Sequence, residues 1–486
     1  MSENGDGAGS PTNGRKIVRV GILAPIAKLD PREAVDNVSN FILGQIFEPP
    51  YAVTAGETAV QPVLFSEPLR HEGGRRYSAA VRAGVTFSDG TPLTADLAVR
   101  SLKRSAVLSP KAAIASSGDR VVFTLTSVNP RFELTLTQSN CAIVLDKDGT
   151  QFGTGPFMFE ERPLLRTLQM TSPMRLIRNP LWHGKTKIDE AQFIVRPADP
   201  DGSPRELIES FRRNEIDLTA ALIVADLTRA NLTSAVPALQ PGNSTGILFF
   251  NTEHRSLSRS DVRKAIALAI DVQDIAQRSY ERNPVAFIAR SLLPPMMGRP
   301  TGLPYMNREE AKRILTAAGA ARPPRLTLLV PWAPRQYLPK PLAAAQAIRT
   351  HLAEVGITVE LRETGTGEEF LADLTGGNFD LALAGWIADN PDPADFFEAL
   401  LWSKMTQGDH QANPSRWKHA GTDAALAAFR EEPTDAHRNE LERIVREEAP
   451  LLPLIYGQSV VSHTRKVRGV SVSSTGIVPL AGISMT

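Results

Sequence analysis

The sequence predicts an α/β protein built from more than one folding unit. In the second half, short apolar runs alternate with amphipathic stretches at helical spacing, which indicates strand–helix units and a mainly parallel sheet there. The first half is richer in β-branched runs and turn residues, which favours strands. The chain has 486 residues, and at about 100 to 200 residues per domain this length corresponds to two to four folding units.

The first half opens with the β-branched run 17–23, whose alternation predicts a strand. A helix is expected over 35–46, because apolar residues recur at helical spacing and a Pro-Pro pair follows. Thr94 is the expected N-cap of a helix that runs to about residue 104. The other elements expected in this half are strands at 77–81, 85–87, 121–125 and 193–196, and a helix at 203–214.

Two turns in this half depend on glycine. Asp89, Gly90 and Pro92 belong to a turn in which glycine supplies the backbone geometry and aspartate makes local hydrogen bonds, so we interpret them as structural. Gly153 and Gly155 form a tight turn before another strand. A phosphate-binding loop is excluded there, because no Lys-Ser/Thr pair follows and no helix is expected.

The second half begins with a strand over 246–252 that is apolar enough to be buried on both faces. A helix over 260–270 follows, with Ser260 or Asp261 as its N-cap. Beyond it, we expect helices at 308–318, 342–355, 368–375 and 434–448, and strands at 326–330, 358–361, 379–384 and 451–456.

The composition excludes several classes of function. Lys and Arg total 54 against 53 Asp and Glu, so no basic surface for nucleic acid is predicted. A single cysteine, Cys141, excludes an intrachain disulfide and zinc sites built on paired thiolates. No apolar run reaches the roughly 18 to 20 residues of a membrane span. The histidines lack metal-ligand spacing and no nucleophile-elbow sequence is present, so neither catalytic residues, a metal nor a cofactor is expected.

Residues 1–16 are rich in Gly, Ser, Asn and Asp and contain no apolar segment, which predicts a flexible leader and not a secretory signal. Two interpretations follow. If a signal was removed, the protein works outside the cytoplasm, in the periplasm or at the cell surface. If Met1 is the native start, the protein is cytoplasmic.

Several motifs, in this order, resemble those of one protein family. The most specific is 77–104, which reads YSAAVRAGVTFSDGTPLTADLAVRSLKR. The others are LDP at 29–31, GTGPF at 153–157, NPLWHGK at 179–185, the segment 250–271, EAKRILTAAG at 310–319, LAEVGITV at 352–359, FDLALAGWIADNPDP at 379–393 and APLLPLIY at 449–456. The chain is thereby similar, over nearly its whole length from residue 17, to the family 5 solute-binding proteins of ABC importers, the oligopeptide, dipeptide and nickel class.

The resemblance implies a two-lobed periplasmic-binding-protein fold (class II, cluster C type) with an extra subdomain inserted in the first lobe. Lobe one would comprise 17–245 and 460–486, with the insertion at about 51–150. Lobe two would comprise 246–459. The ligand would lie in the cleft between the lobes, and strands near 247–251 and 452–458 would form the hinge.

The resemblance also implies ligand-binding residues. In peptide-binding members the aspartate that matches Asp389 pairs with the ligand's α-amino group, and Trp386 would form an apolar or cation–π wall beside it. The alternative is that Asp389 only builds a rigid turn and Trp386 belongs to the core. The other candidates are Gly385, Ala388 and Asn390 of the same segment, Val35 and Asp36 of the lobe-one loop, and Asn251, which would either face the cleft or only bind hinge backbone.

The function implied is capture of a peptide or a peptide-like, amine-bearing small molecule by hinge closure, and its delivery to an ABC transporter. The protein is expected to act as a monomer, without enzymatic activity, and nickel is a less favoured ligand. The alternative is a signal-less intracellular member of the same fold that acts as a ligand sensor, a carrier or a repurposed enzyme in a biosynthetic pathway.

Overall fold

The computed structural model describes residues 14–34, 36–53, 59–161, 173–199, 203–222, 226–227, 230–280, 287–298, 302, 306–318, 325–388, 391–406, 412–472 and 477–486. Within these ranges the strands form one mixed sheet of eleven strands and four small sheets. No helix in the described ranges combines the length and the apolar content that a membrane span requires.

One end of the large sheet is built mainly from the N-terminal half of the chain. β1 pairs in parallel with β12 on one side and with β13 on the other. The strands of this part are β1 (Ile17–Ile22), β10 (Phe157–Phe159), β11 (Met174–Arg178), β12 (Glu190–Val195) and β13 (Leu218–Thr219). The helices beside them are α1 (Asn37–Leu43) and α4 (Arg205–Arg212).

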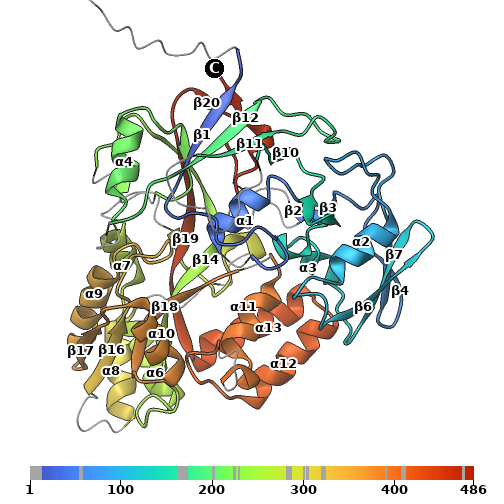
Figure 1. Cartoon of the computed structure of the whole chain (residues 1–486). Helices are drawn as coiled ribbons and strands as arrows, with labels where there is room; N and C mark the ends of the chain where they lie inside the picture. Colours follow the sequence, from blue (N-terminus) through green and yellow to red (C-terminus); the bar gives the residue numbers. More distant parts are fainter. Residues whose placement is uncertain are drawn as a thin grey trace, which may run out of the picture.

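Two long antiparallel strands occupy the middle of the sheet. β14 (Val236–Phe250) pairs with β19 (Leu451–His463) from one end to the other, with register shifts around residues 241–247. β19 also pairs with β13 at its C-terminal end, whereas β14 pairs with a strand of the second half at its own C-terminal end. Figure 1 shows the two strands running from the β1 region to the β18 region. The two strands therefore connect both halves of the molecule.

The second half contributes the other end of the sheet, with β18 next to β14, then β16 and β17. These three strands are mutually parallel, as the sequence predicts, but β14 runs antiparallel to both its neighbours. The bounds are β15 (Phe287–Ile288), β16 (Arg325–Val330), β17 (Thr358–Glu363) and β18 (Leu381–Ile387). The helices are α6 (Ser260–Ala269), α7 (Val272–Ser279), α8 (Arg308–Ala317), α9 (Pro341–Ala353), α10 (Gly367–Gly376), α11 (Pro393–Leu401), α12 (Ala420–Glu431) and α13 (Asp435–Glu448).

An inserted unit lies beside the first half and has a four-stranded antiparallel sheet in the order β4-β5-β7-β6. Its own apolar core includes Phe65, Phe87 and Phe123. The elements are β2 (Tyr51–Val53), β3 (Val60–Pro62), β4 (Arg70–Gly73), β5 (Arg76–Ala80), α2 (Ala95–Leu102), β6 (Ala112–Ser117), β7 (Arg120–Leu125), α3 (Phe132–Thr135), β8 (Leu145–Lys147) and β9 (Thr150–Phe152). Figure 1 shows this unit in blue and cyan to one side of the central sheet.

The C-terminal tail returns to the first half. Val461, Val467 and Leu480 pack in the same apolar cluster as Val18 and Phe41 near the N-terminus. The tail also forms a small hairpin from β20 (Val467–Arg468) and β21 (Ser484–Met485). The chain therefore leaves the first half and comes back to it after completing the second.

Two expectations about local structure were wrong. Residues 85–87 form only an isolated bridge between Thr86 and Pro92, flanked by one bond from the Phe87 N–H to the Thr91 carbonyl and one from the Leu93 N–H to the Val85 carbonyl. The helix α6 has Arg259 as its N-cap and no side-chain cap, since Asp261 instead pairs with the Arg259 guanidinium at 2.6 Å. The turn at Gly153 and Gly155 does depend on glycine, as expected, and the reason is close packing: a Cβ at either position would overlap the Ile46 backbone.

Candidate functional site

A cavity of about 610 Å³ lies where the two halves of the molecule meet. Its walls come from the end of β1, from α1 and from the middle of β14 and β19, while Gln336, Ile387 and Ala388 close it from the second half. A volume of roughly 300 to 1,000 Å³ is typical of small-molecule sites. The position after β1 also fits the rule that ligands bind beyond the carboxyl ends of parallel strands. We refer to this space as the inner cavity.

The inner cavity is lined by apolar side chains and by uncharged amides and hydroxyls. No ionisable side chain belongs to its lining as far as the described residues go. Gln458 of β19 is 4% exposed, and neither its Nε2 nor its Oε1 has a hydrogen-bond partner in the described part of the chain. The Oδ1 of Asn40 in α1 is likewise unpartnered and buried. These atoms have almost no accessible surface, so they lie behind the wall and do not face the open space of the inner cavity.

Other amides in the wall hold the second half against β14. The Asn243 Nδ2 donates to the Ala388 carbonyl at 2.8 Å, and the Ala388 N–H donates to the Asn243 carbonyl at 2.9 Å. The Gln336 Nε2 donates to the Ser244 hydroxyl at 3.0 Å. The two bonds between Asn243 and Ala388 hold the end of β18 beside β14, and Ala388 is the one candidate of the segment 385–390 that lines the inner cavity among those described.

Trp386 and Gly385 lie in β18, outside the described lining of the inner cavity. The Trp386 indole Nε1 donates to Asp395 at 2.7 Å, and the ring packs against the apolar cluster of the second half. A Cβ at Gly385 would come within 2.6 Å of the Tyr337 ring. Asn251 binds backbone: its Nδ2 donates to the carbonyls of Gly377 and Phe379 at 3.1 and 2.9 Å.

The remaining candidate residues either lie outside the described ranges or are next to a residue that does. Asp389, Asn390 and Val35 lie outside the described residues. Asp36 caps α1, where its Oδ1 accepts the Ser39 N–H at 2.8 Å. The neighbours Ala34, Asn37 and Ala388 all line the inner cavity.

The glycine motifs have local roles. Asp89 accepts from the Thr91 N–H at 2.9 Å and pairs with Lys147 at 2.9 Å. Although burial alone would raise the pKa of Asp89, these partners lower it overall. Gly90 has a φ of +86°, as its turn requires, and Pro92 forms the bridge to Thr86.

The motif at 179–185 is tied to the turn at 153–157 through one buried carboxylate. Glu48 accepts from the Thr154 hydroxyl at 2.8 Å and from the Trp182 indole at 2.9 Å, and lies 3.1 Å from the His183 Nε2. The Asn179 Nδ2 donates to the Gly155 carbonyl at 2.8 Å. These two motifs therefore build the scaffold behind α1.

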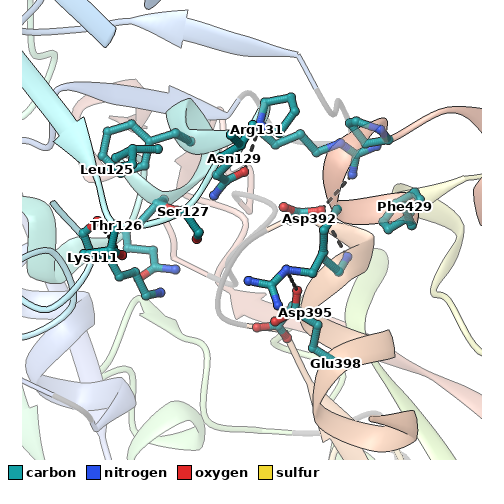
Figure 2. A pocket seen from close by; sticks show the side chains of 18 residues that line it. Lys111, Leu125, Thr126, Ser127, Asn129, Arg131, Asp392, Asp395, Glu398 and Phe429 are labelled. Carbon is teal, nitrogen blue, oxygen red and sulfur yellow. Dashed lines mark hydrogen bonds and ion pairs between the residues drawn. The ribbon is translucent and has the colours of Figure 1, made fainter. Parts of the chain in front are cut away.

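A second cavity, of about 360 Å³, lies between the inserted unit and the helices α11 and α12. Arg131 pairs with Asp392 across it at 2.7 Å, and its guanidinium lies 5.1 Å from the centre of the Phe429 ring. Figure 2 shows Lys111 and Arg131 on one side, with Asp392, Asp395, Glu398 and Phe429 on the other. Burial raises the pKa of Glu398, and the nearby Arg430 opposes this. We refer to this charged space as the outer cavity; Gln138 lines both cavities.

The sequence did not point to Asn40, Asn243, Gln336 or Gln458. Each is an ordinary amide in its local sequence, and only the tertiary fold brings them to one cavity. The only sequence feature that pointed to any of these four residues was the expected hinge strand 452–458, which ends at Gln458. In the described ranges, no group of three or more His, Cys, Asp or Glu side chains is arranged to hold a metal ion.

The chain matches one family model and many known proteins. The model described as bacterial extracellular solute-binding proteins, family 5 Middle, matches residues 59–407. The peptide transport periplasmic protein SapA of Salmonella typhimurium is 29% identical over 352 residues, which are 69% of this chain and 60% of SapA. The Escherichia coli dipeptide-binding protein is 25% identical over 340 residues, or 68% of this chain. The matched part thus spans about 60% of the length of these relatives.

Solved structures share the fold over nearly the whole chain. HbpA2 of Haemophilus parasuis has a TM-score of 0.83 at 21% identity, with 97% of this chain and all of that chain covered. The dipeptide-binding protein of a Pseudoalteromonas species, solved with Met-Leu, has a TM-score of 0.75 at 21% identity and the same coverage. These likenesses show the two-lobed fold.

Proposed function

Because the chain belongs to the bacterial extracellular solute-binding proteins of family 5, we propose that it captures a peptide or a peptide-like, amine-bearing small molecule and delivers it to an ABC transporter. The proposed place of action is outside the cytoplasm, as the family description says of its members. The proposed role is binding and not catalysis. The printed names of the relatives, which include peptide and dipeptide binding proteins, support the ligand class.

The proposed lobes are 17–245 with 460–486, and 246–459. The apolar clusters support this division: one cluster joins residues from Val18 to Leu218 with the tail from Val461 onward, and another runs from Leu248 to Ile455. The separate core of the inserted unit supports a subdomain at about 51–150.

The proposed mechanism is closure of the lobes about β14 and β19, the two strands that both lobes share. A ligand that touches both lobes binds the closed form better than the open form, and only this difference shifts the equilibrium. A shift from mostly open to mostly closed takes about 5 kcal/mol of differential affinity. Charge-assisted hydrogen bonds to a desolvated ligand supply energies of this size.

The observation that carries the proposal is the inner cavity, whose walls come from both halves of the molecule and whose volume of about 610 Å³ suits a small ligand. Asp389 follows directly after Ala388, a lining residue, and we propose that its carboxylate binds the ligand's ammonium group. Asp36 and Val35, next to the lining residue Asn37, are proposed to flank the ligand.

Calorimetric titration of the purified chain with a panel of di-, tri- and tetrapeptides tests the proposal, and small-angle scattering tests closure. We expect saturable binding of at least one peptide and a smaller radius of gyration in the complex. Asp389→Asn is expected to weaken binding about 10- to 100-fold, since a hydrogen bond to a charged group contributes about 1.5 to 3 kcal/mol. Asp435→Asn, an exposed position on α13, is the matched control. The absence of binding across the panel would contradict the proposal.

A further inference from the structure

Large aliphatic side chains that are not buried in the protein line the inner cavity from several directions. They belong to the end of β1, to α1, to the segment after α2, to the end of β18 and to the C-terminal tail. In the described lining they are Leu23, Val38, Val107, Ile387 and Ile477. The one aromatic side chain in that lining, Phe41, is only 7% exposed. The apolar surface that the cavity offers to a ligand is therefore mainly aliphatic.

The aliphatic side chains of the first half are held in place by apolar cores behind them. Val38 and Ile477 pack against the cluster that contains Phe41, and Leu23 packs against a separate cluster that contains Phe211. Each side chain thus rests on protein on one side and keeps accessible surface on the other. Because packing already fixes their positions, a ligand meets a formed surface and does not have to order it on binding.

Ile387 presents aliphatic surface from the opposite wall. Residues 381–384 of β18 are buried, whereas Ile387, the last residue of the strand, is 42% exposed. Three described residues close the cavity from the second half, Gln336, Ile387 and Ala388, and only Ile387 among them has a large apolar side chain. An aliphatic group of a ligand that lies between Ile387 and the first-half wall removes apolar surface from water on both sides.

The polar groups of the site do not depend on the ligand's side chains. The uncharged amides and hydroxyls of the lining suit the peptide groups that every peptide carries. Ionisable residues adjoin the lining in sequence, among them Asp36, Arg335 and Asp389, and the Arg335 guanidinium lies 5.8 Å from the centre of the Trp332 ring. Such charges act alike on two peptides that differ only in one uncharged side chain. Discrimination between those two peptides is therefore left to the apolar wall.

We infer that the inner cavity selects peptides or peptide-like amines that carry an aliphatic side chain, which packs between Ile387 on one side and Leu23, Val38 and Ile477 on the other. This inference rests on the proposed function and narrows its ligand class. It makes Ile387 a specificity-determining residue. Because the aliphatic group contacts both halves of the molecule, its burial also contributes to the preference of the ligand for the closed form.

The test is calorimetry of the full chain with three pairs of tripeptides: Leu-Ala-Ala and Asn-Ala-Ala, Ala-Leu-Ala and Ala-Asn-Ala, and Ala-Ala-Leu and Ala-Ala-Asn. Asparagine has nearly the shape of leucine and no charge, and the ends of the two peptides in each pair are identical. In at least one pair, the leucine peptide is expected to bind about 10- to 100-fold more tightly, the range that full burial of a leucine side chain gives. A ratio below about ten-fold in all three pairs would overturn the inference.

Variants of Ile387 test the residue itself, with the ratio of affinities in the preferred pair as the readout. Ile387→Asn is expected to lower this ratio at least about five-fold, and Ile387→Ala about three-fold, while the affinity for the asparagine peptide stays within about two-fold. Leu371→Asn is the matched control, because Leu371 on α10 is 59% exposed and lies outside the described lining; its ratio should equal that of the wild type. Damage to folding weakens both peptides alike and leaves the ratio unchanged. A wild-type ratio in both Ile387 variants, with binding retained, would overturn the assignment of Ile387.

The failure of this inference differs from the failure of the proposed function. If the leucine and asparagine peptides bind equally well, or if only other members of the wider peptide panel bind, peptide capture stands and selection of an aliphatic side chain is wrong. If no peptide of either set binds, peptide capture itself is wrong, and the inference falls with it.

Discussion

The imidazole of His351 on α9 is 4% exposed and is held between two groups. Its Nδ1 accepts the Asp271 N–H at 3.3 Å, so the ring proton is on Nε2, which lies 3.0 Å from the Asp274 carboxylate. Burial lowers the pKa of His351 below its ordinary value, and the Asp274 charge only partly opposes this. The neutral ring is therefore the form that the folded protein stabilises.

This geometry predicts a pH dependence of stability. Because the folded-state pKa of His351 lies below the unfolded value of 6.5, its contribution is complete above pH 6.5 and is lost as the pH falls towards the folded-state pKa. In urea unfolding between pH 7.5 and 5.5, the free energy of unfolding of the wild type should fall more steeply than that of His351→Gln. His71→Gln, on the exposed strand β4, should keep the wild-type slope. Equal slopes for wild type and His351→Gln would contradict the prediction.

At the scale of single elements, the turn at 153–157 packs directly against the end of α1. The Gly155 N–H donates to the Ile46 carbonyl at 2.9 Å, and a Cβ on Gly155 would lie 2.6 Å from that oxygen. The atoms it would meet are backbone atoms, which cannot rotate away. The turn or the end of the helix would have to move to admit any side chain.

Gly155→Ala is therefore expected to destabilise the protein by about 2 to 3 kcal/mol, a range typical of overpacking. Gly118→Ala is the matched control: Gly118 has a φ of +63° but open space around its Cβ position. Its expected cost is about 1 to 2 kcal/mol, from the left-handed backbone alone. Urea denaturation measures both, and a larger loss for Gly118→Ala would contradict the packing argument.

An element could be predicted from the sequence when its own residues carry the pattern that forms it. The helices α8, α9 and α13 carry helical apolar spacing in their own sequences, and the structure has them within a few residues of the prediction. β14 was predicted as seven residues and has 15, because its N-terminal part is held by pairing with β19 and contains Pro, Gly, Asn and Ser. No pattern within residues 236–245 themselves indicates that they pair with β19.

For the whole molecule, the ion pair of Arg131 with Asp392 joins the inserted unit to the N-terminus of α11 in the second half of the chain. It is partly buried, with side-chain exposures of 26% and 16%, and the Phe429 ring lies against the guanidinium. If the two proposed lobes close about β14 and β19, the pair favours the closed form, because it joins a residue of the inserted unit to a residue of the second half. Its free energy adds to that of the ligand in the closed form.

Arg131→Ala is accordingly expected to enlarge the radius of gyration of the ligand-free protein and to weaken ligand binding about three- to ten-fold, for a partly buried pair worth about 1 kcal/mol. Small-angle scattering and calorimetry measure the two effects. Arg443→Ala removes a pair with Glu440 within α13 and should change neither. An unchanged radius together with unchanged affinity for Arg131→Ala would contradict a closing role.

The candidate site was predictable only where a motif marks it. The segment 379–393 led to Ala388, which lines the inner cavity, and to Trp386, whose indole binds Asp395 instead. Gln458 and Asn40 were not foreseen, because their significance is that they lack partners, a property of the folded molecule. Asp389 stays a prediction.

The path of β19 also sets the order in which the protein can be completed during synthesis. β13 pairs with residues 462–463, and the first apolar cluster needs side chains as late as Ile483. The part of the chain made first therefore waits for the part made last before its sheet and core are finished. A nascent chain that ends before residue 462 carries an open sheet edge at β13.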